Sequence, residues 1–199
     1  MSESRPLTVR PATADAWPVI EEFFTNAVGP CLCQYWRHSA GGYSRASEGE
    51  RWAALRAQVE DEPAPGIIAE ADGRMVGWCG LWPRHRLERL VRSRTIPAVD
   101  ELPVWSIVCF AVRVGYRRRG VARALLAGAV EYARAAGAPA LEAYPVDSGG
   151  RRLDVAFAYV GLVGMFEAAG FRRVAETDAR SAGRPRILMR LDLRGRPSP

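Results

Sequence analysis

The residues best suited to chemistry form one short run, residues 117–123, with the sequence Arg-Arg-Arg-Gly-Val-Ala-Arg. The run follows a nearly continuous apolar segment, residues 105–114, and opens an alanine-rich segment with the apolar spacing of a helix. A helix start leaves backbone N–H groups unpaired and carries roughly half a positive charge, so it attracts phosphate. Gly120 lets the backbone approach an anion closely, and arginines add charge-assisted hydrogen bonds. The pattern predicts a pyrophosphate site; the alternative is a glycine-containing turn with solvated arginines.

Two other common phosphate-binding loops are missing from the sequence. The G-x-x-x-x-G-K-S/T loop needs a lysine, and the chain contains none. No G-x-G-x-x-G follows the first predicted strand, as a dinucleotide-binding fold would require. Sites for ATP and NAD are therefore disfavoured.

Composition narrows the function classes further. The net charge is +6, but the arginines are spread along the chain rather than gathered on one predicted helix, which disfavours nucleic-acid binding. A length of 199 residues suits one domain, and no run approaches the roughly 18 apolar residues of a membrane helix. The N-terminus lacks the apolar run of a secretory signal, and four cysteines are too few for a disulfide framework. We expect a single-domain cytoplasmic protein without a membrane partner.

Hydrophobic periodicity and turn signals predict the elements that must position the arginine run. Asp72-Gly73 marks a hairpin turn, and Thr13 is the expected cap of the first helix. The predicted strands are residues 7–10, 66–71, 75–82, 105–114, 140–146, 171–176 and 186–193, and the predicted helices are residues 13–26, 47–60, 119–136 and 157–169. The fold class is therefore mixed α and β, in the order βααβββαβαββ.

On these residues the chain resembles the GCN5-related N-acetyltransferase (GNAT) superfamily. Residues 117–122 match the family's Q/R-x-x-G-x-G/A motif, residues 104–113 match its fourth strand, and residues 165–171 match its late helix-to-strand signature. The likeness spans about residues 7–193, so it implies one N-acetyltransferase domain over residues 1–199. It also implies a central mixed, mostly antiparallel sheet that splays after the fourth strand and is flanked by helices.

The resemblance implies acetyl-CoA as acyl donor and a primary amine of a small molecule or peptide as acceptor, with direct transfer in a ternary complex. Backbone groups of Phe110, Ala111 and Val112 would bond the pantetheine arm, and the Val112 N–H, near the strand's usual bulge, would polarise the thioester carbonyl. The cofactor-binding residues are these three together with Arg117, Arg118, Arg119, Gly120, Val121, Ala122 and Arg123.

The catalytic residues are harder to assign, because Phe166 occupies the position at which many relatives place a proton-donating tyrosine. Tyr159, seven residues earlier, is the first substitute for that donor, although it also suits a packed aromatic. Tyr144, Asp147 and Asp154 lie at and beyond the predicted strand 140–146, facing the expected acceptor side. A carboxylate there would bind or deprotonate an ammonium; a solvated loop is the alternative. Glu101, before the central strand, is a weaker base candidate.

The segment 31–38, which holds Cys31, Cys33 and His38, is unusual. Its C-x-C spacing is narrower than that of common zinc sites, so we expect no metal and assign the segment to packing or to a wall of the acceptor pocket. Two other functions stay open: a CoA-binding regulatory domain that has lost catalysis, suggested by Phe166, and an arginine-rich nucleic-acid binder. The resemblance also leaves a homodimer open.

Overall fold

The computed structural model describes residues 7–150 and 159–194. In these residues seven strands form one sheet in the order β1-β2-β3-β4-β5-β7-β6. The strands are β1 (Thr8–Pro11), β2 (Gly66–Ala71), β3 (Arg74–Pro83), β4 (Trp105–Val112), β5 (Ala140–Ala143), β6 (Arg172–Ser181) and β7 (Arg184–Asp192). The α-helices are α1 (Trp17–Asn26), α2 (Ala40–Arg45), α3 (Glu48–Glu60), α4 (Glu88–Val91), α5 (Val121–Ala135) and α6 (Val163–Glu167), with 3-10 turns at Ala14–Ala16, Arg84–Arg86 and Val114–Tyr116.

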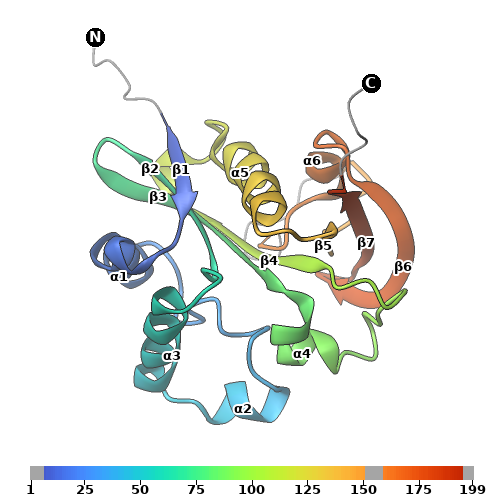
Figure 1. Cartoon of the computed structure of the whole chain (residues 1–199), viewed down its shortest axis with the longest axis horizontal. Coiled ribbons are helices and arrows are strands. Elements are labelled where there is room, and N and C mark those ends of the chain that lie inside the picture. The colour runs from blue at the N-terminus through green and yellow to red at the C-terminus, as the bar shows by residue number, and fades with distance from the viewer. Residues whose placement is uncertain (1–6, 151–158, 195–199) are drawn as a thin grey trace.

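The sheet opens between its two parallel neighbours. Every other strand pair is antiparallel, but β4 and β5 run parallel and pair only between Trp105–Ile107 and Leu141–Ala143. Beyond that contact β5 turns away, and Val146 bridges to Leu162 and Arg186 instead. Figure 1 shows β4 crossing the middle of the molecule, with β5, β6 and β7 diverging to one side. The predicted mixed sheet that splays after the fourth strand is confirmed.

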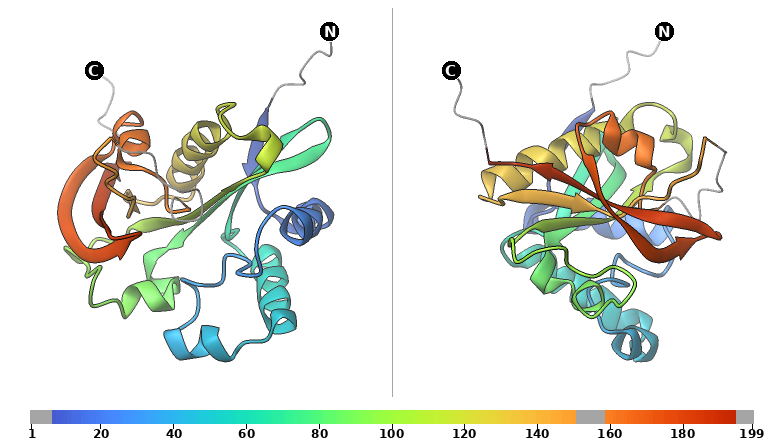
Figure 2. Two further views of the ribbon diagram at one scale, coloured as in Figure 1. Left: turned by 180° about the vertical axis from the view of Figure 1, so that it is seen from behind. Right: turned by 90° about the vertical axis from the view of Figure 1, so that its right-hand side faces the viewer.

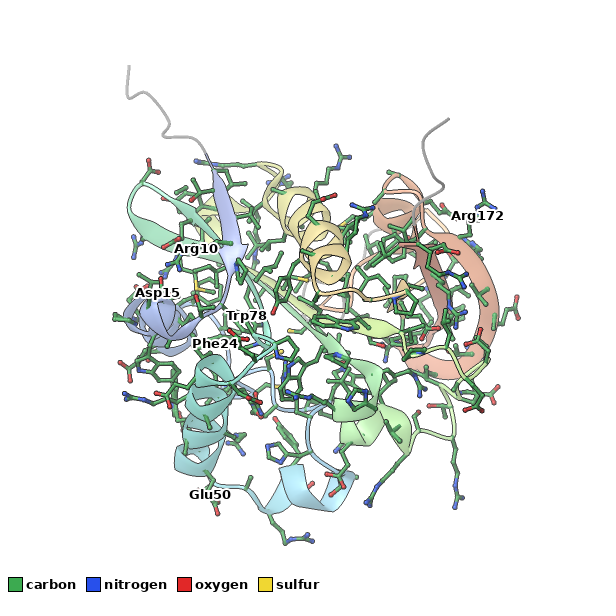
Figure 3. All side chains as sticks on the ribbon, in the orientation of Figure 1. Arg10, Asp15, Phe24, Glu50, Trp78 and Arg172 are labelled. Atoms are coloured by element: carbon green, nitrogen blue, oxygen red, sulfur yellow. The ribbon has the colours of Figure 1, made fainter. Side chains whose placement is uncertain are left out.

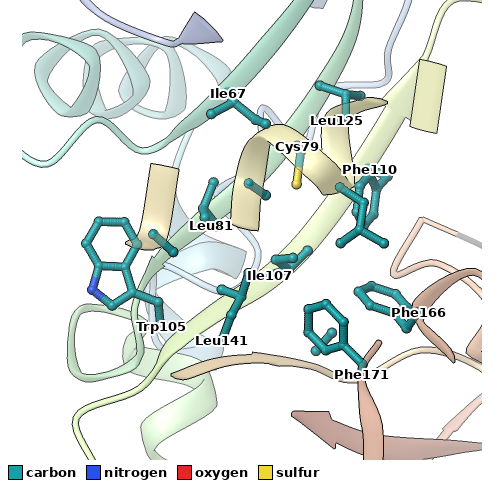
Figure 4. Packing of buried hydrophobic residues seen from close by; sticks show 14 of the residues in the cluster. Ile67, Cys79, Leu81, Trp105, Ile107, Phe110, Leu125, Leu141, Phe166 and Phe171 are labelled. Atoms are coloured by element: carbon teal, nitrogen blue, oxygen red, sulfur yellow. The ribbon is translucent and has the colours of Figure 1, made fainter. Parts of the chain in front are cut away.

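Helices cover both faces of the sheet. Helix α5 packs through Leu125, Leu126 and Ala129 against one face, in the main hydrophobic cluster shown in Figure 4. Helices α1 and α3 pack against the other face, where Phe24 meets Trp78 of β3 edge to face at 5.3 Å (Figure 3). Figure 2 shows α5 and α3 on opposite sides of the strands.

A glycine under α5 sets how closely this helix approaches the sheet. A Cβ on Gly77 of β3 would lie 2.7 Å from Val121 Cγ1 and 2.9 Å from Leu125 Cδ1. Contacts this short are forbidden, so the missing side chain lets the first turn of α5 rest directly on the strand. The start of α5 is thereby held rigidly beside the open edge of β4.

Local sequence signals account for most of the element boundaries. Asp72 and Gly73 both have positive φ, as the tight turn of a two-residue hairpin requires, and Ser47 forms a capping box with Glu50 at the start of α3. Thr13 occupies the N-cap position of the 3-10 turn Ala14–Ala16, which precedes α1, but its side chain makes no capping bond. Its hydroxyl donates to the Asp15 carboxylate, which Arg10 also holds, instead of accepting a bond from a backbone N–H.

Three further differences from the predicted elements stand out. Helix α2 was not predicted, since its two glycines hide any apolar spacing. Strand β6 runs to Ser181, well past the predicted end, because an exposed strand with few apolar residues gives little alternation. The predicted helix 157–169 lies partly outside the described residues, and within them α6 covers Val163–Glu167.

Candidate active site

The start of α5 presents backbone amides without a side-chain cap. Gly120 occupies the N-cap position in the left-handed conformation, at φ 83°, and no side chain caps the helix. A Cβ at Gly120 would meet no atom within 4 Å, so space lies open in front of the first turn. Arg118 also has a positive φ, of 60°, which turns the preceding backbone sharply toward the helix. An anion placed here would meet several unpaired N–H groups and the positive end of the helix dipole.

A large cleft begins at this helix start. It measures about 1310 Å³ and extends along β4 to the segment that precedes α6. Its lining residues are Ala27, Val28, Gly29, Pro30, Cys31, Tyr35, Tyr43, Cys109, Phe110, Ala111, Val112, Tyr116, Arg117, Arg118, Gly120, Val121, Ala122, Arg123, Tyr159, Gly161, Leu162 and Met165.

Nearly all residues predicted to bind the cofactor meet in this cleft. Among the ten, Arg119 alone is not part of its lining; the Arg119 guanidinium lies over the Tyr116 ring at 5.5 Å. Arg117 Nε donates to the carbonyl of Val112 at 3.2 Å, which ties the turn to the end of β4. The arginine run and the strand before it thus form one continuous wall.

The open edge of β4 faces the cleft. Arg113 N–H donates to Val76 of β3, so by the alternation along a strand Val112 and Phe110 point their backbone groups away from β3. The Phe110 N–H already donates to the carbonyl of Tyr159 at 2.5 Å. The bulge of β4 lies at Val108, where the register shifts opposite Gly80 and Leu81, rather than beside Val112 as expected.

The three predicted catalytic residues do not come together. Tyr159 lines the cleft, and burial raises the pKa of its hydroxyl while the charge of Arg186 opposes that rise. Tyr144 is fully buried outside the cleft: its hydroxyl donates to Glu142 at 2.8 Å and contacts Ser106 at 3.0 Å. Burial, with the Glu142 charge next in size, raises the pKa of Tyr144.

Asp147 also lies away from the cleft. Its carboxylate accepts a bond from the Gly149 N–H and pairs with Arg173 at 2.8 Å, and these two contacts, in that order, lower its pKa. Tyr144 and Asp147 follow β5 on the far side of the splay, where side chains pack toward α4 or pair with β6. Glu101 is exposed in the connection before β4, and Asp154 lies outside the described residues.

Comparison with known proteins decides the family. A model of the acetyltransferase (GNAT) family matches residues 31–156, more than half of the chain. The chain belongs to the GNAT acetyltransferase family. No curated protein matches its sequence.

Solved structures share the fold of this GNAT protein at low sequence identity. The Salmonella typhimurium protein yncA, solved with acetyl-CoA, is 16% identical with a TM-score of 0.55, and 97% of each chain is covered. The ribosomal-protein-S18-alanine N-acetyltransferase of Escherichia coli is 17% identical at a TM-score of 0.51, with 94% of each chain covered. The polyamine N-acetyltransferase of Drosophila melanogaster is 11% identical at 0.57, with 94% of this chain and all of that chain covered (100%). These likenesses show the fold.

Within this GNAT fold Phe166 is a core residue. It is fully buried and packs edge to face on Phe171 at 5.1 Å and on Phe110 at 6.1 Å (Figure 4). Phe166, which stands where many relatives have a tyrosine, therefore packs its ring between Phe110 and Phe171. No hydroxyl takes the place of the tyrosine's from the same turn of α6.

Two residues at or near the end of the cleft that Tyr159 lines were not singled out by the sequence pattern. Tyr43, from the unpredicted α2, lines it beside Tyr35. Arg186 of β7 is buried, donates to the carbonyl of Tyr144 at 2.8 Å and lies over the Trp36 ring at 5.1 Å, and its charge acts on Tyr159. Alternation along β7 predicts an inward side chain at 186, but it does not reveal that an arginine there faces aromatic rings.

The segment 31–38 contributes to the wall of the cleft, since Cys31 and Tyr35 are among its lining residues. No group of three His, Cys, Asp or Glu side chains within residues 7–150 and 159–194 is arranged to hold a metal ion. In the same described part of the chain, no helix has the length and apolarity that crossing a membrane would require.

Proposed function

We propose that this GNAT protein is an acetyl-CoA-dependent N-acetyltransferase that transfers the acyl group directly to a primary amine of a small molecule or peptide in a ternary complex. The observation that carries the proposal is the uncapped start of α5, which opens into a cleft that reaches Tyr159. The fold of yncA, solved with acetyl-CoA, is similar to that of this chain. Two other neighbours with the same fold are named for amine acceptors, an alanine and a polyamine.

The residues at the helix start fit the diphosphate of CoA. The amides of Val121, Ala122 and Arg123 would bind its oxygens, and Gly120 leaves room because no Cβ projects there. The side chain of Arg118 lies in the lining and would add charge-assisted hydrogen bonds. Arg119 would contribute through its position in the turn rather than through its guanidinium.

The remaining steps belong to the far end of the cleft. Acetyl-CoA supplies an activated thioester, and Val112 on the open edge of β4 would orient its carbonyl. Tyr159 would give a proton to the departing thiolate, since a hydroxyl with a raised pKa is protonated at neutral pH. The walls formed by Tyr35, Tyr43 and Cys31 would hold the amine and exclude water, so that positioning supplies much of the acceleration.

A CoA-binding protein without catalysis is the second candidate. One observation favours it: Phe166 offers no proton. The bond from the Phe110 N–H to the Tyr159 carbonyl bears on both candidates alike, because the segment at Tyr159 would have to shift before that amide could bond a pantetheine arm. A cytoplasmic location and a homodimer stay predictions.

The test combines binding and turnover on the full chain. Titration calorimetry measures CoA affinity, and thiol release from acetyl-CoA is followed with a panel of primary amines. Thiol release that depends on an amine supports the enzyme. Tight CoA binding without thiol release for any acceptor favours the regulatory domain. A salt-dependent gel shift on nucleic acid without CoA binding would favour the arginine-rich binder.

A further inference from the structure

Arg37 is a buried cation without a carboxylate partner. Arg37 is only 6% exposed. In the described part of the chain, no carboxylate lies within ion-pair distance of its guanidinium. Nε donates to the Cys33 carbonyl at 3.2 Å, Nη2 donates to the Pro65 carbonyl, and the guanidinium lies over the Trp82 ring at 4.4 Å. Among the residues that the structure describes, Nη1 finds no hydrogen-bond partner. Burying a charged group that keeps an unbonded N–H donor costs free energy of folding, so a negative charge is expected beside it.

Cys33, whose carbonyl accepts the Arg37 Nε bond, carries a thiol that can supply such a counter-charge. A Cβ on Gly80 of β3 would overlap that sulfur, and it would lie 3.1 Å from Trp78 Nε1 and 3.5 Å from Cys109 Cβ. Gly80 therefore leaves a small hollow in which the Cys33 sulfur meets β3 and β4. Trp78 Nε1 is also buried and without a hydrogen-bond partner. Trp78 Nε1 borders the same hollow, and Arg37 is tied to Cys33 through the Cys33 carbonyl, so two buried N–H donors that lack a hydrogen bond among the described residues belong to side chains that adjoin Cys33.

The electrostatics agree with this geometry. A hydrogen bond from the Cys109 thiol, the charge of Arg37 and the Trp78 N–H together overcome burial and lower the pKa of Cys33 to about 6. The same contact raises the pKa of Cys109, so the shared proton stays on that thiol. The other titratable group facing Cys33 is Cys79 of β3, whose pKa burial raises. Cys31 acts on Cys109 from the loop side.

We propose that Cys33 and Cys109 form an oxidation site: Cys33 is a thiolate paired with Arg37, and a small peroxide converts the two sulfurs to a disulfide. Cys109 lines the cleft and is partly exposed, whereas Cys33 is buried, so a small peroxide has to pass Cys109 from the cleft to meet the Cys33 sulfur. The oxidation site does not rest on the proposed acyl transfer, although acetyl-CoA would share the cleft that Cys109 lines.

The chemistry balances in two steps. The Cys33 thiolate attacks one peroxide oxygen, the O–O bond breaks, and the departing hydroxide takes up a proton to leave as water with Cys33 as a sulfenic acid. The Cys109 sulfur then attacks the Cys33 sulfur, and the S–O bond breaks. The hydroxide released takes the Cys109 proton and leaves as a second water. The two thiols lose two electrons and the peroxide gains them.

Ionisation is tested first, by the ultraviolet absorbance of the thiolate in the folded full chain between about pH 4 and pH 9. The wild-type protein should show one step near pH 6, the value set by the pKa of Cys33. Cys33→Ser should remove the step, and Cys79→Ser, which removes another buried thiol, should keep it. Absence of a step below about pH 8 in the wild-type protein, or its survival in C33S, overturns the proposal.

Oxidation is tested next with one equivalent of hydrogen peroxide and peptide mass spectrometry. The C31S variant is used alongside the wild type, so that Cys33 is the only cysteine left in its segment. The expected product links Cys33 to Cys109, and it should form roughly tenfold more slowly at pH 5 than at pH 7, in proportion to the thiolate fraction. A bond to Cys31 or Cys79 instead, or a rate that does not change with pH, contradicts it.

Discussion

Replacing Gly120 by glutamate should abolish CoA binding while the fold survives. The new Cβ meets no atom within 4 Å, so the side chain projects into the open space in front of α5 without disturbing the core. The cost in folding is the left-handed conformation at φ 83°, about 1–2 kcal/mol for a residue with a Cβ. Its carboxylate would occupy the place proposed for phosphate oxygens and repel them.

The loss of affinity follows from the contacts removed. If the glutamate displaces two charge-assisted hydrogen bonds of about 1.5–3 kcal/mol each, the loss is at least about 3 kcal/mol. At roughly 1.4 kcal/mol per tenfold change, the dissociation constant for CoA should rise at least about 100-fold. Titration calorimetry measures that constant, and thermal unfolding confirms that the variant is folded.

Gly137→Glu is the matched control, because Gly137 follows the other end of the same helix. Its φ is 75°, and a Cβ there also meets no atom within 4 Å, so the strain and the added charge are alike. The two sites are separated by the 15 residues of α5, about 22 Å of helix. G137E should bind CoA as the wild type does. Equal affinity in both variants, or equal loss in both, would refute the argument from the helix start.

Three further changes test other parts of the structure. Tyr159→Phe should lower kcat at least about tenfold with little change in the KM for acetyl-CoA. Tyr132→Phe, at a tyrosine that does not line the cleft, should leave kcat unchanged. An unchanged kcat in Y159F removes Tyr159 from the mechanism. Glu142→Gln should lower the free energy of unfolding in urea by about 3 kcal/mol, because Glu142 is 1% exposed and pairs with Arg190 at 2.6 Å. Asp192→Asn, which breaks the exposed pair between Asp192 and Arg194, should change it little. Equal losses in the two variants would contradict the argument from burial. Gly77→Ala should lower the stability of the fold by about 1–3 kcal/mol, because the added methyl group pushes α5 away from β3, and the loss is measured as a lower Tm. Gly49→Ala should not lower the Tm, because a Cβ at Gly49 meets no described atom within 4 Å. An unchanged Tm in G77A would show that α5 does not rest on this strand.

The turn that begins α5 was predictable because its signals are local. The left-handed Gly120 and the helix start follow from residues adjacent in sequence, whereas the positive φ at Arg118 does not. The hairpin at Asp72-Gly73 has the same character, since the turn type requires those residue types. The mixed sheet that splays after the fourth strand was expected from the resemblance to a family rather than from periodicity, which does not specify pairing between distant segments.

The catalytic side was harder to predict because it depends on tertiary packing. Tyr144 and Asp147 follow β5 closely in sequence, but the splay carries both away from the cleft. Tyr159 faces the cleft only because the chain turns back against β4, where its carbonyl accepts the Phe110 N–H. The pairing of Cys33 with Arg37 and Cys109 depends on the hollow left by Gly80, which no local pattern in the sequence indicates.

Backbone amide signals at the start of α5 provide the most direct measurement of the central claim. Nuclear magnetic resonance spectra are compared with CoA, with inorganic pyrophosphate and with pantetheine, which lacks the diphosphate. The amides of Gly120, Val121, Ala122 and Arg123 should shift with CoA and pyrophosphate and stay in place with pantetheine. Amides that stay unchanged with CoA, while those of another surface shift, would contradict the assignment of the diphosphate to this helix start.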